Sequence, residues 1–207
     1  MILRTITVGP LESNCYVVGC PDTHRGFVVD PGAEPERIID EIERSGLQIE
    51  YVFNTHGHVD HIAANAAVKE ATGALLVVHE ADREALEKPH PFWASMVGGV
   101  EPSHPDEIMG EDDSYQVGNL TVRVYHTPGH SPGCVCLAVG DTLFTGDTLF
   151  AGSVGRTDLP GGSMETLMRS LSRLLRDFPP ETKVLPGHRG PSNLGDEAAE
   201  NPFLQAF

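Results

Sequence analysis

The first half of the chain alternates between short apolar runs and turn residues. Pro-Asp and Pro-Gly pairs separate the first runs, and Ile38, Ile39 and Ile42 recur at helical spacing before Gly46. This pattern predicts strands over 2–10, 14–20, 26–32, 49–55 and 74–79. It predicts helices over 34–46, 61–73 and 80–88.

The second half repeats the order of strands followed by a helix. Gly118-Asn119 lies between two alternating runs, which indicates a hairpin over 114–126. Further strands are predicted over 134–140, 141–147 and 182–188. The segment 163–178 has leucines along one side and Ser163 as N-cap, which predicts an amphipathic helix, and 196–207 is a short tail with helical character. Two halves of this kind favour an α/β fold in which two packed sheets carry helices outside.

Residues 88–112 have no clear periodicity. They contain four prolines, paired glycines and Trp93, which is the only tryptophan. We expect a long irregular loop near the active site, because loops of this length are often lids or binding loops. A plain surface excursion is the alternative.

Length and composition indicate one globular domain over 1–207. The chain has 40% hydrophobic residues, enough for a buried core, and no apolar run approaches the roughly 20 residues of a membrane helix. The first residues alternate like a strand and do not resemble a signal peptide, so a cytoplasmic location is expected. Four cysteines without a C-x-x-C spacing are expected to be reduced and buried.

The charge balance disfavours one class of partner. The net charge of −16 repels phosphate backbones, and no lysine or arginine run occurs, so nucleic acid is not expected as a substrate. An anionic small molecule would need a local positive source, and a metal ion is one such source.

Histidines and aspartates gather where predicted strands end. The sequence THGHVDH places His56, His58, Asp60 and His61 directly after the strand over 49–55. Three single residues follow other strands within Gly- or Pro-rich segments: His130, Asp147 and His188. Ligand sites of open sheets lie at such strand ends, so these residues are expected to converge.

The number of candidate ligands suits two metal ions. Five histidines and two aspartates exceed the four ligands of a structural zinc site. They fit two divalent ions that share a bridging carboxylate, most simply Zn²⁺, with Fe or Mn also compatible. His56 and His58 face one way in an extended segment, whereas Asp60 and His61 can turn toward a second point.

These residues resemble the metallo-β-lactamase superfamily over nearly the whole chain. The resemblance implies an αββα sandwich of two mixed sheets flanked by helices, with the metals at one edge. It implies that His56, His58 and His130 bind one metal, that Asp60, His61 and His188 bind the other, and that Asp147 bridges.

The stretch GDTLFAGSVGRTDLPGGS, residues 146–163, is similar to the glyoxalase II group of hydroxyacylglutathione hydrolases. This implies cleavage of a small-molecule thioester, such as S-lactoylglutathione, by hydroxide generated at the metals, with Asp60 also orienting that hydroxide. An aspartate at position 147 agrees with this group, because β-lactamases of the superfamily typically carry a cysteine there.

One departure concerns substrate binding. Glyoxalase II enzymes typically carry a C-terminal helical domain that contacts glutathione, whereas only 18 residues follow Arg189, none of them basic. Arg156, Arg189 and Trp93 are the remaining candidates for substrate contacts. Asp30 ends a predicted strand on the same side and is a candidate hydrogen-bond partner for a ligand histidine.

Three alternatives stay open. Persulfide dioxygenases use one iron and oxygen, and they share the run GRTD at 155–158. A non-catalytic metal-binding domain is a second alternative, and an RNA-processing nuclease is disfavoured by the charge. The oligomeric state is not predicted.

Overall fold

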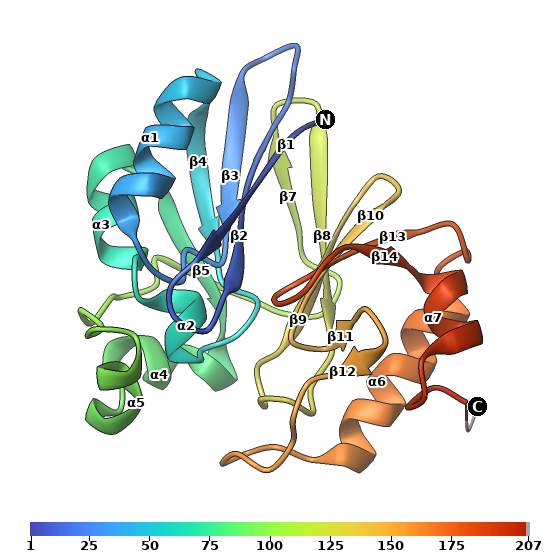
Figure 1. Ribbon diagram of the computed structural model, residues 1–207. Coiled ribbons are helices and arrows are strands. Elements are labelled where there is room, and N and C mark those ends of the chain that lie inside the picture. The colour runs from blue at the N-terminus through green and yellow to red at the C-terminus, as the bar shows by residue number, and fades with distance from the viewer. Residues whose placement is uncertain (206–207) are drawn as a thin grey trace.

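Two mixed sheets pack face to face in the computed structural model, which describes residues 1–205 (Figure 1). The first sheet contains β1 (Ile2–Val8), β2 (Ser13–Gly19), β3 (Arg25–Val29), β4 (Gln48–Phe53), β5 (Leu75–His79) and β6 (Glu107–Met109), in this spatial order. The second has the order β14 (Ser192–Asn193), β13 (Lys183–Pro186), β10 (Thr142–Gly146), β9 (Val135–Val139), β8 (Leu120–His126) and β7 (Ser114–Val117).

Helices cover the outer face of each sheet, which confirms the predicted αββα sandwich (Figure 1). On the side of the first sheet lie α1 (Pro35–Ser45), α2 (Val59–Ile62), α3 (Asn65–Thr72), α4 (Arg83–Glu87) and α5 (Pro91–Met96). On the side of the second sheet lie α6 (Met164–Asp177) and α7 (Leu194–Glu200).

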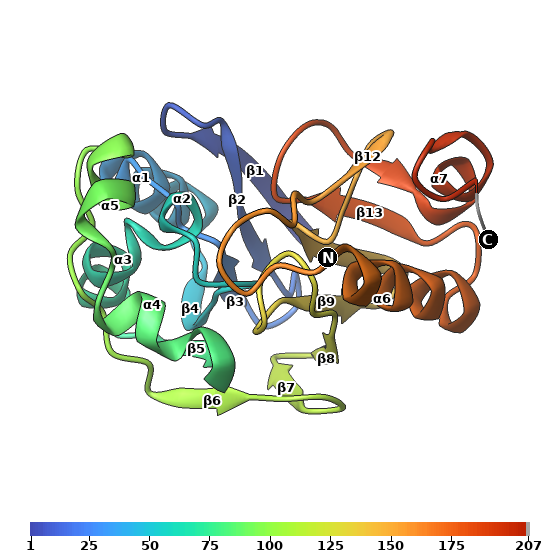
Figure 2. The same ribbon diagram turned by 90° about the horizontal axis from the view of Figure 1, so that it is seen from below.

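Strand direction brings six strand ends to one edge of the sandwich. β3, β4 and β5 are parallel neighbours in the first sheet. In the second sheet β10 is parallel to β13, and two antiparallel steps through β9 give β8 the same direction. The segments that follow these strands therefore meet at one edge, which faces the viewer in Figure 2. This edge holds the candidate site.

The core between the sheets follows from alternation along the strands. In β2, Tyr16 and Val18 point toward the second sheet, and the rings of Phe27 and Phe144 meet edge-on across the interface with centroids 6.3 Å apart. Valines of β8 and β9, together with Leu137 of β9 and Leu185 of β13, complete this layer. Both faces of the central strands are buried, so these strands are apolar throughout.

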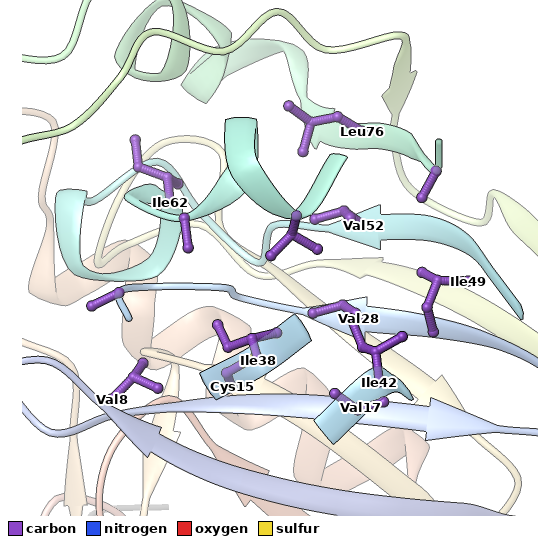
Figure 3. Packing of buried hydrophobic residues seen from close by; sticks show 14 of the residues in the cluster. Val8, Cys15, Val17, Val28, Ile38, Ile42, Ile49, Val52, Ile62 and Leu76 are labelled. Atoms are coloured by element: carbon purple, nitrogen blue, oxygen red, sulfur yellow. The ribbon is translucent and has the colours of Figure 1, made fainter. Parts of the chain in front are cut away.

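The outer layers use the opposite faces of the same strands. Val17 and Val28 point away from the second sheet and pack against Ile38 and Ile42 of α1 (Figure 3). Across the molecule, leucines of α6 cover the second sheet, and the Ser163 side chain accepts a hydrogen bond from the Thr166 N–H, so the predicted N-cap is confirmed.

The predicted helix over 61–73 is wrong in one respect, because the chain forms two helices there. α2 ends at Ile62 and α3 begins at Asn65. The Asn54 amide donates to the His61 carbonyl at 3.1 Å and pairs with the Asn65 side chain. These bonds hold the first turn apart from the helix that follows, and this turn carries Asp60 and His61.

The prediction of an irregular loop over 88–112 is also wrong in part. Pro91 supplies the fixed φ of a first helical residue, and α5 follows it. Residues Glu107–Met109 pair with β5 as the parallel edge strand β6. Short local patterns of six and three residues were too weak to distinguish from a loop.

Three further short strands were not predicted. β11 (Leu149–Phe150) and β12 (Ser153–Val154) form a small hairpin, and β14 pairs with β13. The tail forms α7, which begins two residues before the predicted segment and ends at Glu200, and Ala206 and Phe207 lie outside the described residues.

The cysteines agree with the sequence prediction. All four are buried and free of disulfides in the described structure. No helix within residues 1–205 is both long enough and apolar enough to cross a membrane.

Candidate metal centre

All seven predicted ligand residues lie at the shared strand edge. The segment after β4 carries four of them, and the segments after β8, β10 and β13 carry one each. Six of these side chains form two groups whose candidate ligand atoms lie within 4.8 Å of one another, and Asp30 forms a third such group with His56 and His61. We call His56, His58 and His130 the three-histidine group, and Asp60, His61 and His188 the mixed group.

In the three-histidine group, ring nitrogens point at a common centre. The Nδ1 atom of His58 lies 2.7 Å from the Nε2 atom of His130, and the ring of His56 stands edge-on to both. His56 and His130 are buried, and His58 is partly exposed. The open side of this group therefore lies at His58.

The mixed group combines two imidazoles with a carboxylate. The Nε2 atoms of His61 and His188 lie 3.3 Å apart, and the Asp60 Oδ2 atom is 3.5 Å from the first and 3.2 Å from the second. Asp60 and His61 sit in the single turn of α2, and the centroid of the His61 ring lies 4.2 Å from that of His56, so the two groups adjoin.

Asp147 lies between the two groups. Its Oδ1 atom is 3.4 Å from His61 Nε2, while its Oδ2 atom is 3.3 Å from His130 Nε2 and 3.7 Å from His188 Nε2. One carboxylate therefore faces both groups, which is the position that a bridging ligand needs.

Hydrogen bonds outside the groups fix the orientation of three rings. His130 Nδ1 lies 2.7 Å from the Arg156 carbonyl, so this nitrogen donates and Nε2 keeps its lone pair. His61 Nδ1 lies 3.0 Å from the Asp30 carboxylate, as expected from the position of Asp30 after β3. These partners orient the rings in the way that outer partners orient metal-bound histidines.

Thr55 extends this arrangement to His56. The Thr55 hydroxyl donates to Asp30 Oδ2 at 2.6 Å and lies 3.1 Å from His56 Nδ1. Because the hydroxyl hydrogen points to Asp30, its oxygen accepts the Nδ1 hydrogen of His56, and Nε2 is free as a ligand. Asp30, which is buried, thus contacts one histidine of the mixed group directly and one of the three-histidine group through Thr55.

The two groups differ in ionisation. Burial, with the neighbouring histidines, lowers the pKa of His56 well below its usual value, and burial and His130 lower the pKa of His58 to about 4. Burial also acts against a charge on His61, but the carboxylates of Asp60, Asp147 and Asp30 outweigh it and raise the His61 pKa to about 10. His56 and His58 are therefore neutral at pH 7, whereas His61 holds a proton in the absence of metal.

In Asp60 and His188, the other members of the mixed group, neighbouring charges also outweigh the effect of burial on the pKa. Burial favours a neutral Asp60, but His61 and His188 outweigh burial and hold the pKa of the Asp60 carboxyl well below its usual range. Burial likewise lowers the pKa of His188, and the hydrogen bond to Asp60 and the charge of Asp147 raise it overall.

The residues present fit metal cations. The Nε2 atom of His56 and the Oδ1 atom of Asp147 are buried without a hydrogen-bond partner, although both point into the groups. Within residues 1–205, the carboxylates of Asp30, Asp60 and Asp147 form ion pairs only with histidines. Buried carboxylates need compensating charge, and two divalent ions among these seven ligand side chains would provide it.

The candidate substrate contacts are placed less directly. Arg156 forms two bonds of 2.7 Å with the Asp158 carboxylate, and it reaches the site through its carbonyl to His130. The guanidinium of Arg189 donates to the Ala151 carbonyl at 3.1 Å. Trp93 lies on α5, partly exposed beside Phe92. Both guanidinium groups therefore already have protein partners.

Three buried polar residues of this edge were not predicted from the sequence. Asp82 accepts hydrogen bonds from the two segments that carry the three-histidine group. Ser13 donates to the Asp60 carbonyl, and Asn14 donates to the Arg189 carbonyl next to His188. Asp82 follows β5, a parallel strand of the same sheet, so its position at a strand end was the one signal available. Ser13 and Asn14 stand at the start of a strand and offered none.

Comparison with known proteins agrees with this geometry. The sequence profile of the Metallo-beta-lactamase superfamily matches residues 8–188. The probable metallo-hydrolase YqgX of Bacillus subtilis is 34% identical over 208 residues, covering 99% of this chain and 98% of the relative. The hydroxyacylglutathione hydrolase GloC of Haemophilus influenzae is 30% identical over 211 residues, covering 100% of this chain and 99% of GloC.

Solved structures give the same result. The BLEG-1 B3 metallo-β-lactamase superposes with a TM-score of 0.91 at 34% identity, covering 98% of this chain and 99% of that one. TTHA1623 in a di-iron-bound form gives 0.85 at 39%, covering 97% and 100%, and ETHE1 from Myxococcus xanthus gives 0.83 at 30%, covering 98% and 84%. The chain belongs to the metallo-β-lactamase superfamily.

Proposed function

We propose that this protein is a hydrolase that cleaves thioesters with two divalent metal ions, most simply Zn²⁺, held by the three-histidine group, the mixed group and Asp147. The single observation that carries the proposal is the position of Asp147, whose two oxygens face the two groups. The relative GloC, a hydroxyacylglutathione hydrolase, supports the choice of thioesters. A di-iron form of TTHA1623 supports a pair of metals, and it keeps iron as an alternative.

Bound metal ions would polarise the substrate carbonyl and lower the pKa of a bound water toward 7. The protein supplies orientation and charge around them. Asp60 stays ionised beside His61 and His188, so its carboxylate can accept a hydrogen bond from the attacking water and orient it. His56 and His58 are neutral near pH 7 and keep their lone pairs for ligation.

The leaving group explains why no separate acid is needed. A thiol ionises near pH 8.5, so a thiolate departs without protonation by the protein. The described site is lined by ligands and their hydrogen-bond partners, and each of these already has a role. The absence of a dedicated general acid among the described site residues therefore agrees with thioester cleavage.

The proposed substrate is S-lactoylglutathione or a similar small acyl thioester, with Arg156, Arg189 and Trp93 as contacts. Arg156 and Arg189 would have to exchange partners at Asp158 and Ala151 to bind a glutathione carboxylate. We therefore expect the hydrolysis rate to depend less on the glutathione portion of the substrate than on the acyl thioester group. A role for residues 88–112 in covering the substrate and a cytoplasmic location belong to the same proposal.

A rate assay with matched substrates tests the proposal. Protein loaded with zinc should hydrolyse S-D-lactoylglutathione and an acyl thioester of a simple thiol, and metal removal by a chelator should abolish both rates. The matching oxygen ester should react more slowly, because an alkoxide is a poorer leaving group than a thiolate. Absence of thioester hydrolysis by fully loaded protein would overturn the proposal, and opening of a β-lactam in the same panel would favour the activity named for BLEG-1.

A mononuclear-iron persulfide dioxygenase is the second candidate, favoured by the GRTD run at 155–158. Within that run Arg156 and Asp158 form a bidentate pair beside the carbonyl that orients His130. One iron per chain with oxygen uptake on addition of a persulfide would favour this reaction. Two metals per chain without oxygen uptake would favour the hydrolase. If the metal-loaded protein has neither activity, the non-catalytic metal-binding domain is the remaining alternative.

A further inference from the structure

Asp82 ties together the two ligand segments of the three-histidine group. It is 5% exposed and ends the 3₁₀ turn Glu80–Asp82 after β5. Its Oδ2 atom accepts from the Gly57 N–H at 2.8 Å and from the Ser131 hydroxyl at 2.6 Å, while Oδ1 accepts from the Gly133 N–H at 2.8 Å. Gly57 lies between His56 and His58, and Ser131 follows His130.

The glycines confirm how closely these segments approach Asp82. A Cβ atom at Gly133 would lie 2.6 Å from the Asp82 carboxyl carbon, and one at Gly57 would lie 2.8 Å from Ala85 and 3.2 Å from the Asp82 Cβ. A side chain at either position would force Asp82 or its neighbours to shift. Both segments therefore press their backbone against one residue, and that residue touches none of the three imidazoles through a hydrogen bond.

Asn14 holds the backbone around a ligand of the mixed group, as Asp82 does for the three-histidine group. It is 5% exposed, its N–H donates to the Gly187 carbonyl at 2.7 Å, and its side-chain amide donates to the Pro186 and Arg189 carbonyls at 3.0 and 2.8 Å. These three carbonyls surround His188 in the chain. The neighbouring Ser13 hydroxyl donates to the Asp60 carbonyl at 2.6 Å, so consecutive residues of β2 hold both ends of this group.

We propose that Asp82 and Asn14 are positioning residues that each set the metal affinity of one group, Asp82 for the three-histidine group and Asn14 for the mixed group. This inference rests on the proposed metal centre. Asp82 joins two ligand segments, those of His56 with His58 and of His130. Asn14 holds the segment of His188 against β2, where the neighbouring Ser13 holds Asp60. The two groups would then have separate supports, and either could be weakened while the other stays intact.

Single-group backgrounds separate the two effects. The variant His188→Ala removes a ligand of the mixed group and leaves the three-histidine group, and His130→Ala does the reverse. Asp82→Asn and Asn14→Ala are each placed in both backgrounds, and Zn²⁺ affinity is measured by competition with a chromophoric chelator. Loss of an outer partner typically costs 10–100-fold in metal affinity.

Asp82→Asn should weaken zinc binding by about 10–100-fold in the His188→Ala background and by less than about threefold in the His130→Ala background. Asn14→Ala should show the opposite pattern. Asp106→Asn is the matched control. The Asp106 carboxylate, like that of Asp82, accepts a backbone N–H, here from Leu76 at 2.8 Å, but it lies at the end of β5 away from the metal centre. This variant should change neither affinity.

Equal losses in both backgrounds, or no loss in either, would overturn the inference. If Asp82→Asn does not fold, Ser131→Ala removes one of the bonds to Asp82, and Ser13→Ala removes the bond to the Asp60 carbonyl. Both variants should show the same selectivity with smaller effects. If neither single-group background binds zinc at all, the proposed ligand sets are wrong. That result is distinct from a failure of Asp82 and Asn14 to act selectively.

Discussion

The three-histidine group and the mixed group lie at one edge of the same sandwich but differ in charge. In the first, burial and the neighbouring histidines lower the pKa values of His56 and His58, so these two rings are neutral at pH 7. The second surrounds His61 with three carboxylates, which keep a proton on its ring when no metal is present. A metal can enter the first group without displacing a proton, whereas in the second it must compete with one.

Replacement of the residue that the groups share should have the largest effect. Asp147→Ala removes a carboxylate that faces both groups. Zinc affinity should fall in both single-group backgrounds by more than about 100-fold, since loss of an outer partner alone costs 10–100-fold. The control Asp141→Ala removes the carboxylate at the opposite end of the same segment, where it pairs with exposed Lys183. A loss confined to one background would contradict a bridging role.

Removal of a ligand from the mixed group should be nearly as severe for activity but not for total metal. Asp60→Ala removes the carboxylate that faces His61 and His188. Zinc content should fall from two per chain to one, and thioester hydrolysis should fall by more than about 100-fold. Elemental analysis and initial rates check this together. Two retained zinc ions with an unchanged rate would remove Asp60 from the site.

The pH dependence of zinc binding should separate the two groups directly. The His61 pKa is about 10, above its usual value, so between pH 7 and 9 the mixed group binds zinc only by releasing that proton. The affinity of His130→Ala should therefore rise with pH, by about tenfold per unit for one proton. The His58 pKa is about 4 and His56 is neutral, so His188→Ala should show nearly constant affinity over this range. Parallel pH profiles would contradict the difference in charge.

A smaller effect is expected at Thr55. Thr55→Val keeps the shape but removes the hydroxyl between Asp30 and His56, so His56 loses the acceptor that orients its ring. Zinc affinity of the three-histidine group should fall by roughly tenfold, the lower end of the outer-partner range. The mixed group should change less, because His61 keeps its own bond to Asp30. Thr55→Ser keeps the hydroxyl and should retain most of the zinc affinity. If Thr55→Ser loses as much affinity as Thr55→Val, the loss comes from altered packing of the side chain and not from the hydrogen bond.

The smallest effect should come from a residue remote from both groups. Ser163→Ala removes the N-cap of α6, whose side chain accepts from the Thr166 N–H at 3.3 Å. Stability should fall by about 1 kcal/mol in chemical denaturation. Zinc affinity should stay unchanged in both backgrounds. A change in zinc affinity would show that the two groups depend on the packing of α6 against the second sheet, and not only on nearby hydrogen bonds.

Local periodicity predicted most of the fold. Strands buried on both faces, such as β9, read as continuous apolar runs, and Ile38 and Ile42 marked the buried side of α1. The sites could be predicted because strand ends carry function in open sheets, so His130, Asp147 and His188 stood out against apolar neighbours. The break between α2 and α3 could not be predicted, since it depends on the side chain of Asn54.

The supports of the two groups were hidden for the same physical reason. Asn14 and Pro186 lie 172 residues apart in the chain, and Asp82 and Gly133 lie 51 apart. Such hydrogen bonds exist only after both sheets have packed, and neither residue type is unusual at its position. A sequence pattern reports local preference, so it located the candidate ligands but not the residues that bond to their segments.

Stepwise loading with metal tests the central claim most directly. Metal-free protein is titrated with zinc from zero to two equivalents per chain, and hydrolysis of S-D-lactoylglutathione is followed at each step. The two-metal account predicts little activity up to one equivalent, while the three-histidine group fills, and a rise to full rate between one and two. Full activity at one equivalent, or none at two, would contradict it.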